Sequence, residues 1–352
     1  MISSNCAVWF EELMMIRYSK IASRVTRTLV VLLMIFPAIA AHAQERASVS
    51  YDGTAGFNGP IWAAQDLKLF EAHGLRTELI LVSGSARAMA ALISDSIQFA
   101  QGSATAAIPV QLRGGDVVII GAALNKFPFT LVAQKEIRKP ADLKGKKIGV
   151  LNFGGSNELA VNLALNEWNI PRQSVTILAT GSAPARLSAL SSKALDATVL
   201  SPPETFMAAR LDFNVLAQLT DLKASFPQSV ITVRRSFLEK NRETVKKFMR
   251  AYSEAIYLFK SNKQKVLGVY KDRLKQQDAG VIEQTHSYFA PKFSFPPRVD
   301  PDGMRIVLEQ VSQREPEAKR PFKSDRFVDE SIIDELEKEG FFKRLVETGT
   351  GK

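Results

Sequence analysis

Small polar residues gather where the predicted strands end, and they could bind a small solute there. The segments are 52–57, 83–85, 102–104, 153–157 and 181–182, with 201–204 as a weaker sixth. In open α/β sheets, ligands lie beyond the carboxyl ends of the strands, where helix N-termini offer free N–H groups. Glycine allows close approach to the backbone, and Ser, Thr and Asn supply neutral hydrogen bonds. Because the pattern recurs at almost every strand end, it favours solute binding over turn formation alone.

Other kinds of chemistry have little support in the sequence. The chain has one cysteine, Cys6, and three histidines, so neither a disulfide framework nor a Cys/His zinc site can be built. Of the histidines, His73 and His286 are expected to be surface or packing residues. Gly154-Gly155 belongs to no phosphate-binding or dinucleotide-binding motif. We therefore predict no catalytic residue, no metal and no cofactor.

Aromatic and cationic residues near these loops are the remaining candidates for ligand contact. The aromatic residues expected nearest the cleft are Phe57, Trp62, Phe127, Phe129, Phe153 and Phe206. A few of them could stack on a flat ligand, although most such side chains belong to cores. Arg87 and Arg186 occupy similar places in two predicted helices and are expected to make internal contacts. Lys126 then stays open as an anion contact.

Short apolar runs alternate with amphipathic helical stretches, which predicts βαβ units on mostly parallel sheets. The expected strands are 49–51, 78–82, 97–100 and 117–122 in a first series, 147–151, 175–178 and 197–200 in a second, and 230–233 after both. The expected helices are 59–72, 86–94, 106–113, 156–168 and one around 186–190. Residues 237–345 read as helices with proline-rich breaks. A Gly-Ser pair opens a helix in each series, at Gly84-Ser85 and Gly181-Ser182, which indicates two related α/β lobes.

The N-terminus has the three-part pattern of a cleaved export signal. Four basic residues between positions 17 and 27 precede the apolar run 29–41, and Ala41-His42-Ala43 resembles a cleavage site. The run is shorter than the roughly 20 apolar residues that span a bilayer. A start at Met14 would leave residues 1–13 untranslated. No cysteine follows the cleavage site, so we expect a periplasmic protein without a lipid anchor.

Composition limits the partners. The 352 residues include 46 Lys plus Arg and 36 Asp plus Glu, a net charge of +10. Removal of residues 1–43 takes away four cations and two anions and leaves +8. An exported protein with scattered charge has no natural nucleic-acid partner. The apolar and charged fractions, 46% and 23%, exclude a disordered or polytopic membrane protein.

Three parts of the chain carry a family resemblance. They are 60–64 with 69–75 (PIWAA and LFEAHGL), 142–150 (DLKGKKIGV), and a C-terminal part with FVD at 327–329, EL at 335–336 and GF at 340–341. They resemble the nitrate/sulfonate/taurine/thiamine-precursor group of ABC-transporter substrate-binding proteins. The cysteine-rich motif of the related pyrimidine-synthesising enzymes is absent.

The resemblance implies a type II periplasmic-binding fold, in which two α/β lobes are joined by a two-crossover hinge near 129–133 and 229–233. It implies a monomer that captures a small organic solute by hinge closure and delivers it to an ABC permease with a cytoplasmic ATPase. Its binding positions carry over to Thr54, Phe57, Ser85, Ser103, Ser156, Asn157 and Ser182. No arginine stands in those loops, which argues against a strongly anionic ligand.

The expected domains are a signal peptide at 1–43, lobe one at 44–132 and again at 230–345, lobe two at 133–229, and a tail at 346–352. The C-terminal helices return to lobe one. Two alternatives stay open beside the importer component. One is an enzyme on the same fold, of the pyrimidine-precursor synthesis or lyase type. The other is a periplasmic receptor that presents its ligand-bound form to a signalling partner.

Overall fold

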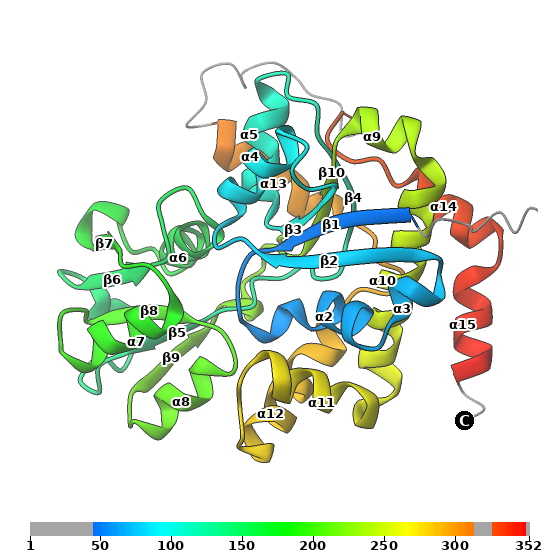
Figure 1. Ribbon diagram of the computed structural model, residues 1–352. Coiled ribbons are helices and arrows are strands. Elements are labelled where there is room, and N and C mark those ends of the chain that lie inside the picture. Colours follow the sequence, from blue (N-terminus) through cyan, green and yellow to red (C-terminus); the bar gives the residue numbers. More distant parts are fainter. Residues whose placement is uncertain (1–44, 313–325, 350–352) are drawn as a thin grey trace, which may run out of the picture. The chain divides into compact units, whose positions relative to one another are not determined.

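Two five-stranded sheets organise the chain (Figure 1). The computed structural model describes residues 45–312 and 326–349, so the predicted signal peptide lies outside the described residues. The strands are β1 (Glu45–Tyr51), β2 (Leu75–Leu81), β3 (Phe99–Gly102), β4 (Val118–Ala122), β5 (Thr130–Ala133), β6 (Lys147–Val150), β7 (Thr176–Ala179), β8 (Ala197–Leu200), β9 (Asn214–Gln218) and β10 (Val230–Val233). Within the described part of the chain, no helix is both long and apolar enough to cross a bilayer.

The two sheets repeat one strand order. The first sheet runs β2-β1-β3-β10-β4 and the second runs β7-β6-β8-β5-β9. In each, the first three strands are parallel, and the fourth is antiparallel to both of its neighbours. The prediction of two related α/β lobes is confirmed. Four strands of each sheet run in one direction, as the expected mostly parallel sheets require, and β5 and β10 run against them.

Helices surround both sheets. Those of lobe two, the second sheet and its helices, are α6 (Ser156–Glu167), α7 (Ala183–Ser191) and α8 (Glu204–Arg210). Those of lobe one, built on the first sheet, are α2 (Gly59–Asp66), α3 (Leu69–Ala72), α4 (Ser85–Ile93), α5 (Ala104–Leu112), α9 (Arg235–Lys240), α10 (Arg242–Ser261), α11 (Lys263–Arg273), α12 (Ala279–Phe289), α13 (Pro301–Ser312), α14 (Ser331–Lys338) and α15 (Phe341–Gly349). The predicted domain limits stay predictions. The chain leaves the first sheet between β4 and β5 and returns between β9 and β10.

Two local features differ from the sequence-based expectations. The single helix predicted at 59–72 is broken into α2 and α3 at Lys68, whose φ of 57° lies in the left-handed region. No glycine or proline marks this break, so residue types alone do not predict it. Strand β9 was not predicted, because its side chains are half-buried or exposed and do not form a clear apolar run.

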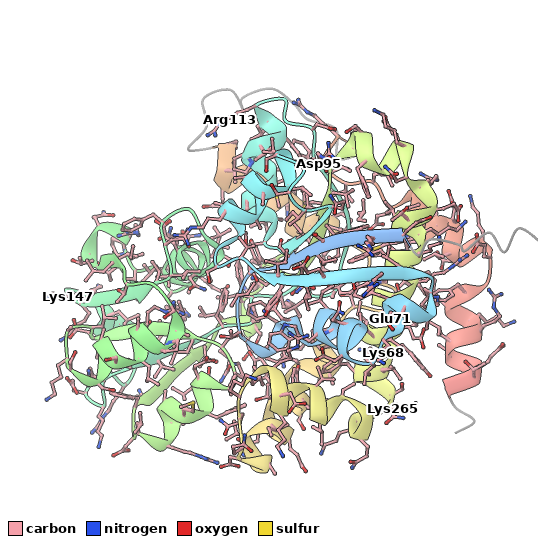
Figure 2. All side chains as sticks on the ribbon, in the orientation of Figure 1. Lys68, Glu71, Asp95, Arg113, Lys147 and Lys265 are labelled. Atoms are coloured by element: carbon pink, nitrogen blue, oxygen red, sulfur yellow. The ribbon has the colours of Figure 1, made fainter. Side chains whose placement is uncertain are left out.

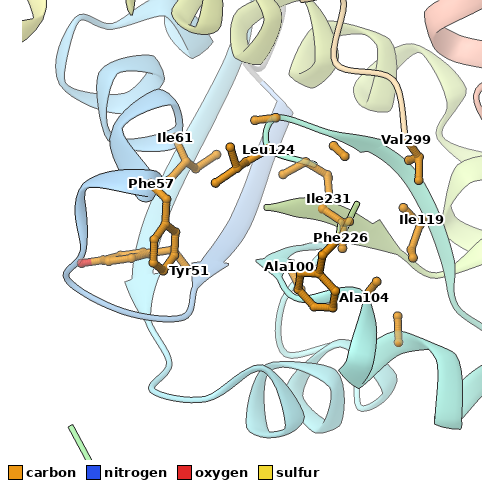
Figure 3. Close-up of a cluster of buried hydrophobic side chains, with 14 of the residues drawn as sticks. Tyr51, Phe57, Ile61, Ala100, Ala104, Ile119, Leu124, Phe226, Ile231 and Val299 are labelled. Atoms are coloured by element: carbon orange, nitrogen blue, oxygen red, sulfur yellow. The ribbon is translucent and has the colours of Figure 1, made fainter. Parts of the chain in front are cut away.

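Apolar packing ties the returning helices to the first sheet. Helix α10 buries one face against α2 and α3. Its Phe248 stacks on Phe99 of β3, with ring centroids 4.0 Å apart. Figure 3 shows another part of this core, where Ile61 lies near Phe57 and Leu124, and Ile231 lies near Phe226. Full burial of each such side chain contributes roughly 1.5–3 kcal/mol, so lobe one depends on the C-terminal helices for its stability.

Surface charge is spread over both lobes. Lys68 and Lys265 are exposed on lobe one, and Lys147 is exposed on lobe two (Figure 2). Many other cations are neutralised locally. Lys246 contacts Glu335 and Glu339, and Arg298 contacts Glu330.

Candidate functional site

One pocket of about 590 Å³ lies where strand ends of the two sheets face each other. Lobe one contributes the loops after β1 and β2, and lobe two contributes those after β6, β7 and β8. Phe129 and Gln228, from the two connections between the sheets, complete the wall. The lining residues come from the carboxyl ends of strands, which is the position that the sequence analysis predicted for the site.

The pocket contains five of the seven predicted ligand-binding residues. They are Thr54, Phe57, Ser156, Asn157 and Ser182. The loop 102–104 does not line the pocket, whereas the segment at 201–204, the weakest by sequence, contributes two residues. Direct contact between these side chains and a ligand stays a prediction.

Ser85 and Ser103 lie behind the pocket wall. The Ser85 hydroxyl donates to Asp52 Oδ2 at 2.8 Å and accepts from the Ser103 N–H at 3.1 Å. The Ser103 hydroxyl oxygen accepts from the Thr105 N–H at 3.3 Å and caps helix α5. Both hydroxyls are therefore used within lobe one, and Ser85 holds the carboxyl group of Asp52.

Asp52 is a pocket residue that the sequence analysis did not single out. It follows β1, and burial raises the pKa of its carboxyl to about 6, although the Ser85 hydrogen bond lowers the pKa. Its Oδ1 atom is buried and has no hydrogen-bond partner within the described residues. This carboxyl therefore has an unused acceptor at the pocket.

Glu204 is its counterpart in lobe two. It begins α8, just after β8, and burial raises the pKa of its carboxyl to about 7. Its own backbone N–H and the charge of Arg186 lower the pKa by smaller amounts. Its Oε2 atom is buried and has no partner among the described residues. Each lobe thus places one carboxyl with a raised pKa in the same pocket.

Two arginines line the pocket, one turn inside helices α4 and α7. Arg186 is buried, and its guanidinium donates to the carbonyl oxygens of Gly181 and Val199. Burial lowers its pKa to about 10, against the raising effect of Glu204. Arg87 is exposed on the pocket wall, whereas Lys126 is not a lining residue. The internal role predicted for Arg186 is confirmed, and the prediction that Lys126 is the open cation is wrong.

Few of the aromatic candidates reach the pocket. Phe57 and Phe129 line it with most of their surface buried. Trp62 packs edge-to-face on Tyr51 with centroids 5.9 Å apart and belongs to the core. Phe153 is 58% exposed, on the loop that precedes α6, and is not a lining residue. The pocket therefore has two apolar wall residues, Phe57 and Phe129, rather than a cage of aromatic rings.

Hydrogen bonds give both strand-end loops their shape. The Asn157 side-chain oxygen accepts from the Leu151 N–H at 3.2 Å, and Glu158 Oε2 accepts from the Gly154 N–H at 2.7 Å. In lobe one, Asn58 Nδ2 donates to the Gly53 carbonyl at 2.8 Å. These bonds hold the loops in place within the protein itself. Binding of a ligand therefore needs little further ordering of the loops.

The two lobes also touch through the backbone. The Gly56 N–H donates to the Pro202 carbonyl at 3.1 Å, and the hydroxyl of Tyr270 donates to the Gly56 carbonyl at 2.6 Å. An ion pair between Arg210 of α8 and Asp278 at the start of α12 adds a second contact at 2.6 Å. The first contact joins the loops after β1 and β8, and the second joins the end of α8 to the start of α12.

The two lobes share one strand order, two connections join their sheets, and a pocket lies between the strand ends. This arrangement defines a periplasmic-binding fold. The chain belongs to the NMT1/THI5-like family, whose model matches residues 58–265. A curated relative, "Putative binding protein YtlA" of Bacillus subtilis (strain 168), is 23% identical over 248 residues, which are 68% of this chain and 74% of that protein.

Solved structures share the fold over most of the chain. The ligand-binding component of an ABC-type import system from Staphylococcus aureus, with zinc bound, has a TM-score of 0.70 at 16% identity and covers 83% of this chain and 99% of its own. The alkanesulfonate-binding protein SsuA from Xanthomonas axonopodis pv. citri, bound to MOPS, has a TM-score of 0.65 at 18% identity, with 82% and 97% covered. No group of three or more potential metal ligands occurs among the described residues of this chain.

Proposed function

We propose that this protein is the solute-binding component of an ABC importer, which captures a small organic solute between its lobes and delivers it to a membrane permease. The observation that carries the proposal is the pocket of about 590 Å³ between the strand ends of both lobes. This volume is in the roughly 300–1,000 Å³ range of sites for small organic molecules. Membership of the family and the names of the relatives support the same class.

The connections between the sheets are suited to a hinge. Residues 123–129 and 219–229 link the sheets, and the C-terminal helices stay with lobe one. Rotation about two short connections can open or close the pocket without changing either sheet. A bound solute would contact both lobes and thus favour the closed arrangement.

The cellular setting is part of the proposal. The basic and apolar pattern before residue 44 supports export and cleavage of a signal peptide. The protein would then act in the periplasm as a monomer and bring its solute to a permease coupled to a cytoplasmic ATPase. Intact mass of the exported protein tests the cleavage, since a mature form that retains the apolar run 29–41 would contradict it.

An enzyme on the same fold is the second candidate, and one observation favours it. Asp52 and Glu204 have pKa values raised to about 6 and about 7, a range that suits general acid or base chemistry. Against this, the Ser85 hydroxyl that bonds Asp52 is not among the lining residues of the pocket. Incubation of the purified protein with a bound solute, followed by mass spectrometry of that solute, separates the candidates, because a binding protein returns the solute unchanged.

Two measurements test the importer proposal. The protein is purified without denaturation, and native mass spectrometry identifies any solute that it retains. A strain lacking the gene is then assayed for uptake of that solute, with the wild-type gene restored as a control. We expect loss of uptake on deletion and recovery on restoration. Normal uptake in the deletion strain would overturn the importer role.

A further inference from the structure

Three residues that line the pocket each have a buried acceptor atom that no described group satisfies. These atoms are Asp52 Oδ1, Glu204 Oε2 and Gln228 Oε1. Gln228 is 2% exposed, and its backbone N–H is already used, donating to the Leu124 carbonyl at 2.9 Å. An unsatisfied buried polar atom costs roughly 1–3 kcal/mol. Three such atoms in one pocket indicate that a hydrogen-bond donor belongs there.

The three acceptors come from three separate parts of the fold. Asp52 follows β1 in lobe one, Glu204 follows β8 in lobe two, and Gln228 precedes β10 in the connection between the sheets. A solute that satisfies all three must therefore contact both lobes and the hinge region together. This arrangement couples recognition of the donors to closure of the lobes.

The carboxyl groups of Asp52 and Glu204 differ in the charged side chains that lie near them. The described charged side chains that line the pocket are Asp52, Arg87, Arg186 and Glu204. Arg186 faces Glu204 and offsets part of its charge. No cation makes an ion pair with Asp52 among the described residues, and its hydrogen-bond partner Ser85 is neutral. The place for a positive charge is thus beside Asp52.

We infer that the pocket takes an organic cation with N–H groups at both ends: a protonated nitrogen beside Asp52, and further N–H donors facing Glu204 and Gln228. This inference rests on the proposed solute-binding function and names the class of solute. A buried carboxylate without a partner is strongly disfavoured, and a bound cation supplies that partner. Phe57 and Phe129 suit a flat, partly apolar centre to the molecule.

Proton exchange on binding gives an independent readout. Burial raises the pKa of Asp52 to about 6 and of Glu204 to about 7, so both groups hold protons part of the time near pH 6.5. A cation with N–H donors favours the ionised carboxyls and releases protons when it binds. A sulfonate or carboxylate has the opposite effect and takes protons up, because it favours the neutral acids.

The experiment uses probes that share one ring. 4-Aminobenzamidine has donors at both ends, benzamidine at one end, and benzoate and benzenesulfonate are anions. Thermal shift ranks their binding to the purified protein, and calorimetry at pH 6.5 in two buffers of different ionisation enthalpy gives the number of protons exchanged. We expect 4-aminobenzamidine to bind best, with proton release, and the sulfonate not to bind.

Matched variants assign the effect to the pocket. Asp52→Asn and Glu204→Gln should each weaken 4-aminobenzamidine at least tenfold, whereas Asp272→Asn and Glu136→Gln, which remove the same charges at exposed positions, should not. If a pocket variant fails to fold, the number of protons that the wild-type protein exchanges on binding still tests the proposal.

The outcomes separate the two proposals. Binding by the anions alone, proton uptake, or no binding by either amidine overturns the assignment of a cationic solute. An anion that binds still supports the solute-binding function. A protein that binds no probe, retains no solute on purification and is dispensable for uptake would sink both proposals.

Discussion

The side chain of Gln101 donates a 2.6 Å hydrogen bond to Asn58 Oδ1 in the interior of lobe one. Gln101 lies on β3 and accepts in turn from the Tyr252 hydroxyl of α10 at 2.8 Å. Asn58 Nδ2 in turn donates a hydrogen bond to the Gly53 carbonyl, in the loop that lines the pocket. A buried chain of hydrogen bonds thus links a C-terminal helix to the ligand-facing loop after β1.

The first prediction concerns this chain. Tyr252→Phe keeps the packing of the ring but leaves Gln101 Oε1 without its donor, so we expect the free energy of unfolding to fall by about 1–2 kcal/mol. Chemical denaturation measures the change. Tyr257→Phe is the control, because the Tyr257 hydroxyl is exposed and makes only a 3.4 Å bond to the Val346 carbonyl. Equal effects of the two substitutions would show that the buried chain is not important for stability.

The second prediction concerns occupancy of the pocket. Ser156→Trp places an indole at a lining position, so solute affinity should fall at least tenfold while the melting temperature without solute changes little. Ser192→Trp, at the exposed far end of α7, is the control and should keep full affinity. Calorimetry with the solute identified by native mass spectrometry measures both. Unchanged affinity in Ser156→Trp would place the binding site elsewhere.

The third prediction concerns pH. A carboxyl whose pKa is raised by folding stabilises the native state below its unfolded pKa, near 4, and that contribution is lost as pH rises through the folded value. For Asp52 and Glu204 the loss occurs between pH 4 and about 7 and amounts to about 3 kcal/mol each. Asp52→Asn or Glu204→Gln should therefore flatten the fall in unfolding free energy of the solute-free protein between pH 5 and 8.

Denaturant titrations at pH 5, 6, 7 and 8 test this for the wild type and each variant. Burial lowers the pKa of His286, but this contribution to the pH dependence is the same in every variant and cancels in the comparison. Identical slopes in wild type and variants would show that neither carboxyl is desolvated in the pocket.

The fourth prediction concerns the packing of Gly56 on helix α12 within lobe one. A Cβ atom at this position would lie 2.6 Å from Thr285 Cγ2 and 2.7 Å from the Phe289 ring. Gly56→Ala should therefore destabilise the protein by roughly 1–3 kcal/mol through overpacking. Gly53→Ala in the same loop has no atom within 4 Å of its new Cβ and should leave the melting temperature unchanged. Similar melting temperatures for both variants would contradict the packing seen at Gly56.

Sequence alone predicted most of the loops that line the pocket. Alternation of strands and helices predicted which loops end the strands, and Thr54, Phe57, Ser156, Asn157 and Ser182 do line one pocket. Asp52 and Glu204 fall within the predicted segments 52–57 and 201–204 but were not singled out, because an isolated acidic residue after a strand is ordinarily solvated. Their raised pKa values depend on burial by residues distant in the sequence, and Ser85, which bonds Asp52, is 33 positions away.

The two arginines had different outcomes. Arg186 makes the internal contacts predicted for it, whereas Arg87 is exposed on the pocket wall. Arg87 is one turn inside its helix, and helix geometry returns such a side chain towards the N-terminal end. Edge strand β9 and the left-handed Lys68 were missed because they lack an apolar run or a glycine. What the sequence could not predict depends on contacts between segments far apart in the chain.

The interleaving of the sheets has a consequence for the order in which the lobes can form during synthesis. All five strands of the second sheet have been made once residue 218 is present, but β3 and β4 of the first sheet do not acquire their shared neighbour until β10, at 230–233, follows. The face of α2 and α3 is covered later still, by α10. Lobe two can therefore mature first, and a chain translated from its N-terminus leaves lobe one unfinished until nearly the last helices are made.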